Sequence, residues 1–207
     1  SVRATFSLPS LTYVAQQLLH PLILTVSKKI YTFFSLGKII LAAARKFHFI
    51  SVAVEKAELH GFKPSFAELK MPNALAMLAL NQFKKLDEFN THRRSIARIY
   101  QDNLKGSIYQ LPALNLEVVP VFLRYTILVS DPKALHQKAK EQKIELGDWY
   151  QHAIAPRHVD YQTILYNPTT CPQAELLATQ SLNLPTHQGI TEKDAHTIIL
   201  FLKAHAR

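Results

Sequence analysis

The C-terminal stretch of the chain constrains its fold most, because proline and capping residues divide it into short elements of alternating type. Cys171-Pro172 predicts the start of a helix, since proline at the first helical position gives up no intrahelical hydrogen bond. We expect this helix to end near Ser181. Leu182–Pro185 then predicts a short buried strand, because proline cannot donate to a strand ladder. A helix followed directly by a buried strand indicates an α/β fold.

A further helix is predicted after this strand. Thr191 is its expected N-cap, and the carboxylate of Asp194 can reach back to the cap N–H, as in a capping box with Asp in place of Glu or Gln. Ile198, Ile199 and Leu202 then fall on one face of the helix. That face is expected to pack against the sheet layer.

The residues before this stretch continue the alternation of strands and helices. Val118–Val129 predicts a strand, Asp131–Gln142 a helix capped by Asp131, and Ile144–Leu146 a second strand. We therefore predict a small two-layer α/β domain over residues 106–207.

A long helix is predicted to precede this domain, starting at Pro72 or Asn73. Its apolar residues keep a helical period to Gly106, which is about 30 residues and about 45 Å of helix. We assign residues 67–105 to a domain-linking helix. Its outer face carries basic residues, a pattern typical of a solvated surface; these are Lys84, Lys85, Arg93, Arg94 and Arg98.

Residues 1–66 form a basic, hydrophobic helical segment in this interpretation. Leu11–Phe34 and Gly37–Val54 are predicted helices that are apolar on more than one face. Such a pair favours a packed helical hairpin, or a surface that awaits a partner, over a lipid-binding device.

The net charge of +9 is distributed unevenly along the chain. Residues 1–54 hold six Lys or Arg and no Asp or Glu. The charge-free window Ala4–Ser27 is interrupted by Pro9 and Pro21 and falls short of the roughly 20 apolar residues that a membrane span needs. A single cysteine excludes an internal disulfide and is compatible with a cytoplasmic protein. Association of residues 1–54 with a membrane surface stays open, and nucleic-acid binding ranks last.

Four sequence motifs, in order, carry a family resemblance, supported upstream by Met71–Ala74 and by Leu78–Asn90. The chain resembles the C-terminal part of the DegT/DnrJ/StrS family of pyridoxal-phosphate-dependent sugar aminotransferases. The resemblance implies the C-terminal half of a fold-type I transferase, with residues 1–66 as an insertion or a remnant of its large domain. The motifs are Gly147–Tyr150, Cys171–Glu175, Leu182–His187 and Thr191–Asp194.

The resemblance also implies a function for the whole protein of which this chain would be a piece. That function is amino transfer from an amino-acid donor to a nucleotide-linked keto-sugar, by a homodimer with pyridoxal 5'-phosphate, in amino-sugar biosynthesis for surface polysaccharide. The family's Schiff-base lysine lies in its large domain, upstream of the matched motifs. Since the chain starts at Ser1 rather than Met, we expect a fragment that is inactive alone. The alternative is a non-catalytic binding or membrane-surface module.

The family's cofactor-phosphate contact from the neighbouring subunit is altered here. Its asparagine and arginine are matched by Glu68 and Lys70, so only Lys70 is a candidate cofactor-binding residue. The family's histidine after Tyr150 is matched by Ala155, and its role is either lost or moved to His152.

Five residues are candidates for substrate binding. Trp149 and Tyr150 can supply a stacking wall for a sugar or base, and Asp148 precedes them in the same motif. Arg124 lies on a predicted strand among apolar neighbours and needs an anionic partner, either an acidic side chain or a substrate phosphate. His187 follows a strand end, where a turn role is favoured over a site role.

Two other chemistries are disfavoured. Cys171 has no neighbouring base to activate it as a nucleophile. No standard metal-site spacing is present in a group of potential ligands, so we predict no metal; these are Asp148, His152, His158 and Asp160.

Overall fold

The computed structural model describes residues 6–30, 36–47, 49–52, 54–113 and 117–206. The chain divides into two compact units. The N-terminal unit comprises Ser1–Lys84 and His158–Ile164, and the C-terminal unit comprises Lys85–Arg157 and Leu165–Arg207.

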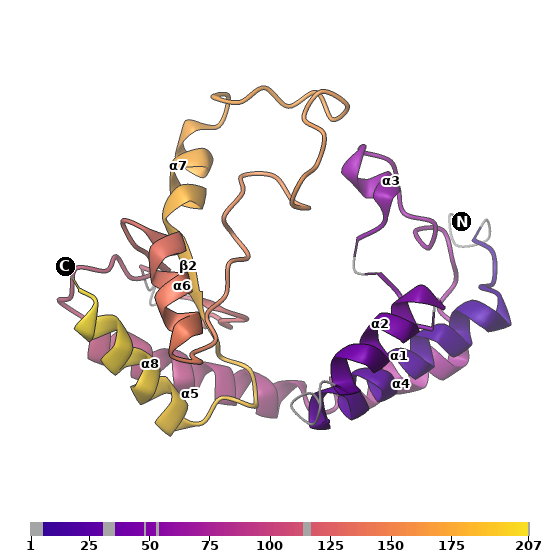
Figure 1. Cartoon of the computed structure of the whole chain (residues 1–207), viewed down its shortest axis with the longest axis horizontal. Coiled ribbons are helices and arrows are strands. Elements are labelled where there is room, and N and C mark those ends of the chain that lie inside the picture. The colour runs from indigo at the N-terminus through magenta and orange to yellow at the C-terminus, as the bar shows by residue number, and fades with distance from the viewer. Residues whose placement is uncertain (1–5, 31–35, 48, 53, 114–116, 207) are drawn as a thin grey trace. The chain divides into compact units, whose positions relative to one another are not determined.

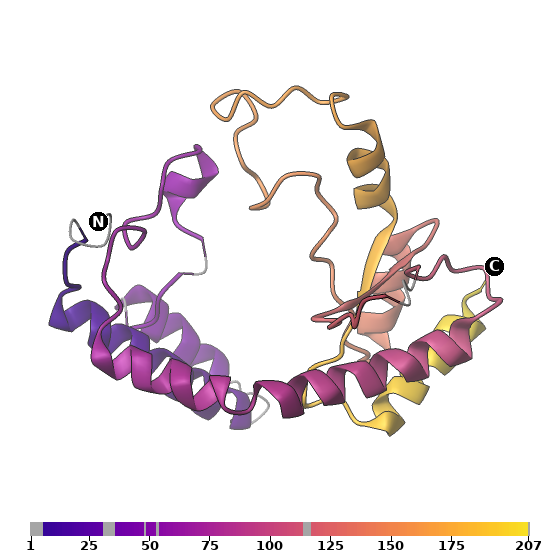
Figure 2. The same ribbon diagram turned by 180° about the vertical axis from the view of Figure 1, so that it is seen from behind.

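The N-terminal unit is helical in its described part. Its helix α1 begins after Ser10, whose hydroxyl accepts a hydrogen bond from the Tyr13 N–H at 3.2 Å. Both α2 and α4 contact α1, and the three helices lie side by side in Figures 1 and 2. The helices are α1 (Leu11–Lys29), α2 (Leu36–Lys46), α3 (Lys56–Leu59) and α4 (Asn73–Phe83).

The two predicted N-terminal helices are present but shorter than expected. Helix α1 confirms the first as far as Lys29, and residues 31–34 lie outside the described residues. The second prediction is wrong for the described residues after Lys46, where α2 ends, and residues 48 and 53 lie outside the described residues. The residues that follow α2 are largely aromatic or β-branched, and these side chains lose rotamer freedom in a helix.

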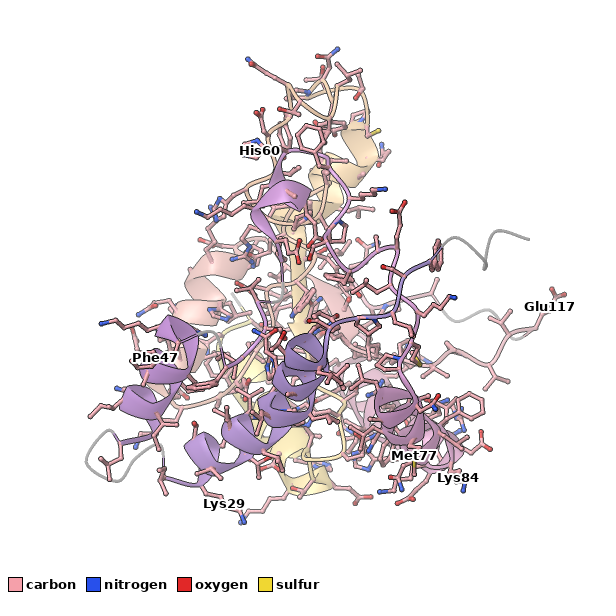
Figure 3. The ribbon with its side chains drawn as sticks, turned by 90° about the vertical axis from the view of Figure 1, so that its right-hand side faces the viewer. Lys29, Phe47, His60, Met77, Lys84 and Glu117 are labelled. Atoms are coloured by element: carbon pink, nitrogen blue, oxygen red, sulfur yellow. The ribbon has the colours of Figure 1, made fainter. Side chains whose placement is uncertain are left out.

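Many large apolar side chains of the N-terminal unit are exposed to solvent. Helix α4 has no buried residue, and the exposed fraction is 73% for Met77 and 70% for Phe83. Phe47, after the end of α2, is likewise exposed, and Figure 3 labels Met77 and Phe47. None of the helices in the described part of the chain is both long enough and apolar enough to span a bilayer.

A later segment of the chain, residues 158–164, completes the N-terminal unit by packing beside α3. The Asp160 N–H donates to the Leu59 carbonyl at 2.7 Å. Gly61 has a φ of +74°, and a Cβ atom there would lie 2.7 Å from Cγ2 of Ile164. Both the backbone conformation and the close approach therefore require glycine at position 61.

In the residues that the structure describes, the C-terminal unit combines four helices with a two-stranded antiparallel sheet. Tyr125 pairs with Leu184 at one end of the sheet, and Leu128 pairs with Ser181 at the other. Helices α5 and α8 contact each other and lie side by side in Figures 1 and 2. The elements are α5 (Leu86–Leu104), β1 (Tyr125–Leu128), α6 (Pro132–Glu141), α7 (Pro172–Gln180), β2 (Ser181–Leu184) and α8 (Glu192–Ala204).

One hydrophobic core joins the sheet to α5, α6 and α8. Three tyrosine side chains lie in this core, and the hydroxyl of each donates a hydrogen bond. Tyr100 donates to the Pro185 carbonyl at 3.0 Å, and Tyr109 donates to the Leu202 carbonyl at 2.7 Å. Tyr125 donates to the Gln101 side chain. Burial raises the pKa of each of these hydroxyls, so they remain protonated donors at neutral pH. The core also contains Ile96, Leu104, Ile127, Leu135, Leu182, Leu184, Ile198, Ile199, Phe201 and Leu202.

The predicted helix and strand boundaries after residue 130 are largely confirmed. Asp131 caps α6 by accepting the Ala134 N–H, and α7 begins at Pro172. The capping box of α8 is complete: the Thr191 hydroxyl accepts the Asp194 N–H at 3.1 Å, and the Asp194 carboxylate accepts the Thr191 N–H at 2.9 Å.

Three predicted elements differ in the structure. The single helix predicted from Pro72 or Asn73 to Gly106 is two helices, because the backbone at Lys85 (φ −97°, ψ 2°) leaves the helical region. The strand over 118–129 is limited to Tyr125–Leu128; its first part contains Pro120, which cannot donate to a ladder. Residues 144–146 form no strand, since pairing with β2 is reduced to a single bridge between Gly147 and Asn183.

Candidate functional site

A pocket of about 240 Å³ in the C-terminal unit brings together several side chains that carry chemistry. We call it the Trp149 pocket. Helix α5, the segment before β1, the loop after α6 and the end of β2 all contribute to it. Its lining consists of Arg93, Leu123, Arg124, Glu145, Leu146, Gly147, Trp149, Asn183, Leu184, Pro185, Thr186 and His187.

Asn183 fixes one wall of the Trp149 pocket. Asn183 is 1% exposed; its amide oxygen accepts a hydrogen bond from the Trp149 backbone N–H at 3.0 Å, and its amide nitrogen donates to the Thr126 hydroxyl at 3.0 Å. The Asn183 backbone also exchanges two hydrogen bonds with Gly147, at 2.8 and 3.0 Å. A Cβ atom at position 147 would lie 3.0 Å from Cβ of Asn183, so glycine permits this close pairing.

Arg124 and Trp149 are in direct contact. The Arg124 guanidinium carbon lies 4.2 Å from the centroid of the Trp149 ring, within the range of a cation–π interaction. The indole is 65% exposed. Trp149, the predicted stacking residue, therefore packs against Arg124, the predicted anion-binding residue.

Arg93 enters the pocket from α5. Its Nε atom is shielded from solvent and has no hydrogen-bond partner among the described residues. A buried donor without a partner costs about 1–3 kcal/mol, which marks this guanidinium as a group that awaits an acceptor.

The end of β2 closes the pocket through a tight turn. The buried Thr186 hydroxyl donates to the Phe122 carbonyl at 2.6 Å. The His187 ring accepts the Gly189 N–H at 3.1 Å, and the His187 carbonyl accepts the Ile190 N–H at 2.9 Å. His187 is therefore a turn residue that also lines the pocket, and its role in substrate binding stays a prediction.

Asp148 and Tyr150 do not belong to the described lining of the Trp149 pocket. Asp148 pairs with Arg157 at 2.8 Å between its carboxylate and the guanidinium. The hydrogen bond from Arg157 holds the pKa of Asp148 below its ordinary value, against partial burial. Tyr150 is 46% exposed. The predicted set is thus divided: Arg124, Trp149 and His187 come together, whereas these two lie beside the pocket.

Lys70 belongs to the N-terminal unit. Its backbone N–H donates to the Ser7 carbonyl at 2.8 Å, and its side chain is exposed. Glu68, the other residue matched to the family's phosphate contact, forms an ion pair with Lys63. The cofactor role of Lys70 stays a prediction.

The Trp149 pocket does not fit pyridoxal phosphate as its Schiff-base site. That cofactor needs a lysine amine and an acidic partner for its ring nitrogen. Among the described lining residues none is a lysine. In the described part of the chain, no three His, Cys, Asp or Glu side chains gather as metal ligands either. The donor set is instead one that binds anions and stacks on flat groups.

Sequence reasoning missed two residues of this pocket. Arg93 was assigned to the solvated face of the long helix, yet it lies three and seven residues before the buried Ile96 and Tyr100. That spacing places it on the buried stripe and could have revealed it. Asn183 stands between two leucines of a buried strand, where a polar residue needs a partner.

Comparison with known proteins gives one family and a set of related folds. The model of the DegT/DnrJ/EryC1/StrS aminotransferase family matches residues 39–203. A DegT DnrJ EryC1 StrS aminotransferase from Brucella abortus is 24% identical with a TM-score of 0.52, and the match covers 61% of this chain and 34% of that protein.

Two further solved structures are similar. DesV from S. venezuelae, determined in complex with a ketimine intermediate, is 20% identical with a TM-score of 0.59 over 72% of this chain and 42% of that protein. The sugar aminotransferase CalS13 from Micromonospora echinospora is 20% identical with a TM-score of 0.52, over 60% of this chain and 33% of that protein.

These matches define the fold. The chain spans 34%, 42% and 33% of the three proteins, so it corresponds to a part of each. The predicted family resemblance and the predicted fold class, a C-terminal portion of a fold-type I transferase, are both confirmed.

Proposed function

The chain belongs to the DegT/DnrJ/EryC1/StrS aminotransferase family, and from this premise we propose that it is the C-terminal portion of an aminotransferase acting on a nucleotide-linked keto-sugar. The observation that carries the proposal is the family match over residues 39–203. The cofactor would be pyridoxal 5'-phosphate, which accepts an amino group from an amino-acid donor and passes it to a keto group.

The residues of this chain would serve substrate binding in that reaction. The cofactor lysine is expected in a part of the protein upstream of Ser1, because the family carries it in the large domain that precedes the matched motifs. Arg124 and Trp149 offer a cationic and a flat surface toward a substrate. They would hold the sugar nucleotide while the large domain performs the amino transfer.

We also propose an oligomeric state, a cellular location and a biosynthetic role. A homodimer in the cytoplasm, with Lys70 reaching the cofactor phosphate of the neighbouring subunit, follows from the family resemblance alone. A role in the synthesis of amino sugars for surface polysaccharide has the same basis.

The test compares the 207-residue chain with a longer protein that includes the coding sequence upstream of Ser1. Both are assayed with a series of amino-acid donors and nucleotide-linked keto-sugars, and amino transfer is followed through the absorbance of the cofactor and through the sugar product. We expect turnover by the longer protein and none by the 207 residues. Turnover by the short chain would contradict the placement of the lysine, and inactivity of a cofactor-loaded longer protein would contradict the proposed reaction.

A second candidate function rests on the six basic and no acidic residues in positions 1–54. These could bind the N-terminal unit to an anionic membrane surface. Co-sedimentation with vesicles tests this: binding has to require anionic lipid and weaken with salt, because charge attraction is screened. Binding that is indifferent to both contradicts the electrostatic interpretation.

A further inference from the structure

The Trp149 pocket carries an excess of positive charge. Arg93 and Arg124 both line it, and within the described residues neither forms an ion pair with a carboxylate. Glu145 is the one acidic residue of the described lining, so the two arginines leave the pocket with a net positive charge. A half-buried cation that lacks an acidic partner favours entry of an anion.

The unpartnered Nε of Arg93 points to the same conclusion independently. This donor is shielded from water, and the described protein offers it no acceptor. Arg93 lies on the stripe of α5 that also carries Ile96 and Tyr100, both of them buried. An oxyanion on the Nε edge of the guanidinium would supply the missing acceptor through a charge-assisted hydrogen bond.

Arg124 is held in place before any ligand arrives. The Trp149 ring packs against its guanidinium at 4.2 Å, and the Trp149 backbone is in turn fixed by the Asn183 side chain at 3.0 Å. An ordered side chain loses less conformational entropy on binding, so its contact with a ligand is worth more. Trp149 therefore acts as a positioning residue for Arg124.

The number of guanidinium groups favours phosphate over carboxylate. One carboxylate carries a single negative charge on two oxygens, and one arginine guanidinium can bind both oxygens with two parallel hydrogen bonds. A phosphate group carries up to two charges and presents three acceptor oxygens, enough for two forks from different elements. We propose that Arg93 and Arg124 form a phosphate-binding site, which takes the diphosphate of the nucleotide-linked sugar. The identity of that ligand rests on the proposed function, whereas the site itself does not.

Trp149 provides the readout, because it is the only tryptophan of the chain and lies in the pocket. Inorganic pyrophosphate is titrated into the 207-residue chain while the tryptophan emission is recorded, and calorimetry gives the same dissociation constant without relying on the indole. We expect a saturable change. Arg93→Gln and Arg124→Gln should each weaken binding about tenfold or more, since each removes a charged hydrogen bond.

Two further variants serve as controls for the pyrophosphate-binding measurement. Arg98→Gln removes the same charge from the exposed side of α5, outside the described lining, and should change the dissociation constant less than about twofold. Arg124→Lys keeps the charge but lacks the fork, and should bind with intermediate strength. Circular dichroism verifies that each variant is folded.

Several outcomes would overturn the site. One is the lack of saturable pyrophosphate binding by the unaltered chain. Another is a loss of pyrophosphate affinity in Arg98→Gln as large as in Arg93→Gln and Arg124→Gln, because this would indicate unspecific charge attraction. Glutarate that competes as well as pyrophosphate would also contradict a phosphate site. Uridine diphosphate and pyridoxine phosphate, which lacks the reactive aldehyde, separate the two sources of phosphate, and stronger binding of pyridoxine phosphate would contradict the assignment to the substrate.

The binding result is distinguishable from the test of the proposed function. Pyrophosphate binding that depends on Arg93 and Arg124 supports the site even if the longer protein transfers no amino group. Amino transfer by the longer protein without such binding supports the reaction and overturns the site.

Discussion

At the scale of single residues, Asn183 has the largest expected effect on stability. Its amide joins the Trp149 backbone to Thr126 inside the sheet, and the residue is 1% exposed. Asn183→Ala removes both bonds and leaves two polar groups and a small cavity, so we expect a loss of about 3 kcal/mol in the free energy of unfolding. Urea denaturation measures this loss. The exposed Asn103→Ala is the matched control and should change stability less than about 0.5 kcal/mol.

The Asp148–Arg157 pair predicts that the free energy of unfolding depends on pH. The pKa of Asp148 is lower in the folded chain than in the unfolded chain, so its charged form stabilises the fold above about pH 4 and this stabilisation is lost as the pH falls through the folded pKa. Asp148→Asn should therefore lower stability at pH 7 by less than about 1 kcal/mol, as for exposed pairs, and the difference should vanish in acid.

Urea denaturation at several pH values measures the difference between Asp148→Asn and the unaltered chain. Arg157→Gln should reproduce the same pH profile. An NMR titration that places the carboxyl pKa of Asp148 at or above its ordinary value would contradict the explanation.

Residue roles were predictable where local chemistry determines them. The caps at Asp131 and Thr191 follow from side chains that reach only three residues along the chain. The contact between Arg124 and Trp149 joins residues far apart in sequence, so no local pattern could predict it. Arg93 was missed because it was one of five basic residues on the single helix that the sequence predicted, and it was interpreted by its charge rather than by its spacing to Ile96 and Tyr100.

At the scale of elements, the capping box of α8 sets the start of a helix that packs on α5. Thr191→Ala removes the hydroxyl that accepts the Asp194 N–H, and we expect a loss of about 1 kcal/mol. Thermal or urea unfolding measures it. Thr197→Ala makes the same chemical change at an exposed position within α8 and should be neutral or slightly stabilising, because alanine has the higher helix propensity. Equal losses in both variants would contradict the capping role.

Helices that begin at a proline or a capping residue were predicted better than elements whose ends carry no such residue. Helix α7 starts at a proline and α8 at a capping box, and both predictions are confirmed. The interruption between α4 and α5 falls at Lys84-Lys85, where neither glycine nor proline gives a signal. The predicted strand over residues 144–146 has suitable composition, but strand formation requires a partner, and its pairing is limited to the bridge at Gly147.

At the scale of the whole molecule, the two units differ in how they use their apolar residues. The C-terminal unit buries them in a core that includes Tyr100, Tyr125 and Leu202. The N-terminal unit leaves large apolar side chains exposed along α1, α2 and α4. The sequence predicted apolar helices there, yet composition alone cannot tell a buried face from an exposed one, because both have the same residue types.

The exposed face of α4 predicts binding of an apolar dye by the folded chain. Met77 and Phe83 are 73% and 70% exposed, and large exposed apolar side chains offer the dye ANS a surface to bind. Replacing both by Glu should lower dye fluorescence while it changes the free energy of unfolding by less than about 0.5 kcal/mol, because α4 has no buried residue. Leu165→Glu, at a position that is 90% exposed in the C-terminal unit, is the control and should leave dye binding unchanged. Dye binding that survives the double replacement would place the accessible apolar surface elsewhere, and a large loss of stability would mean that α4 packs more tightly than its exposure indicates.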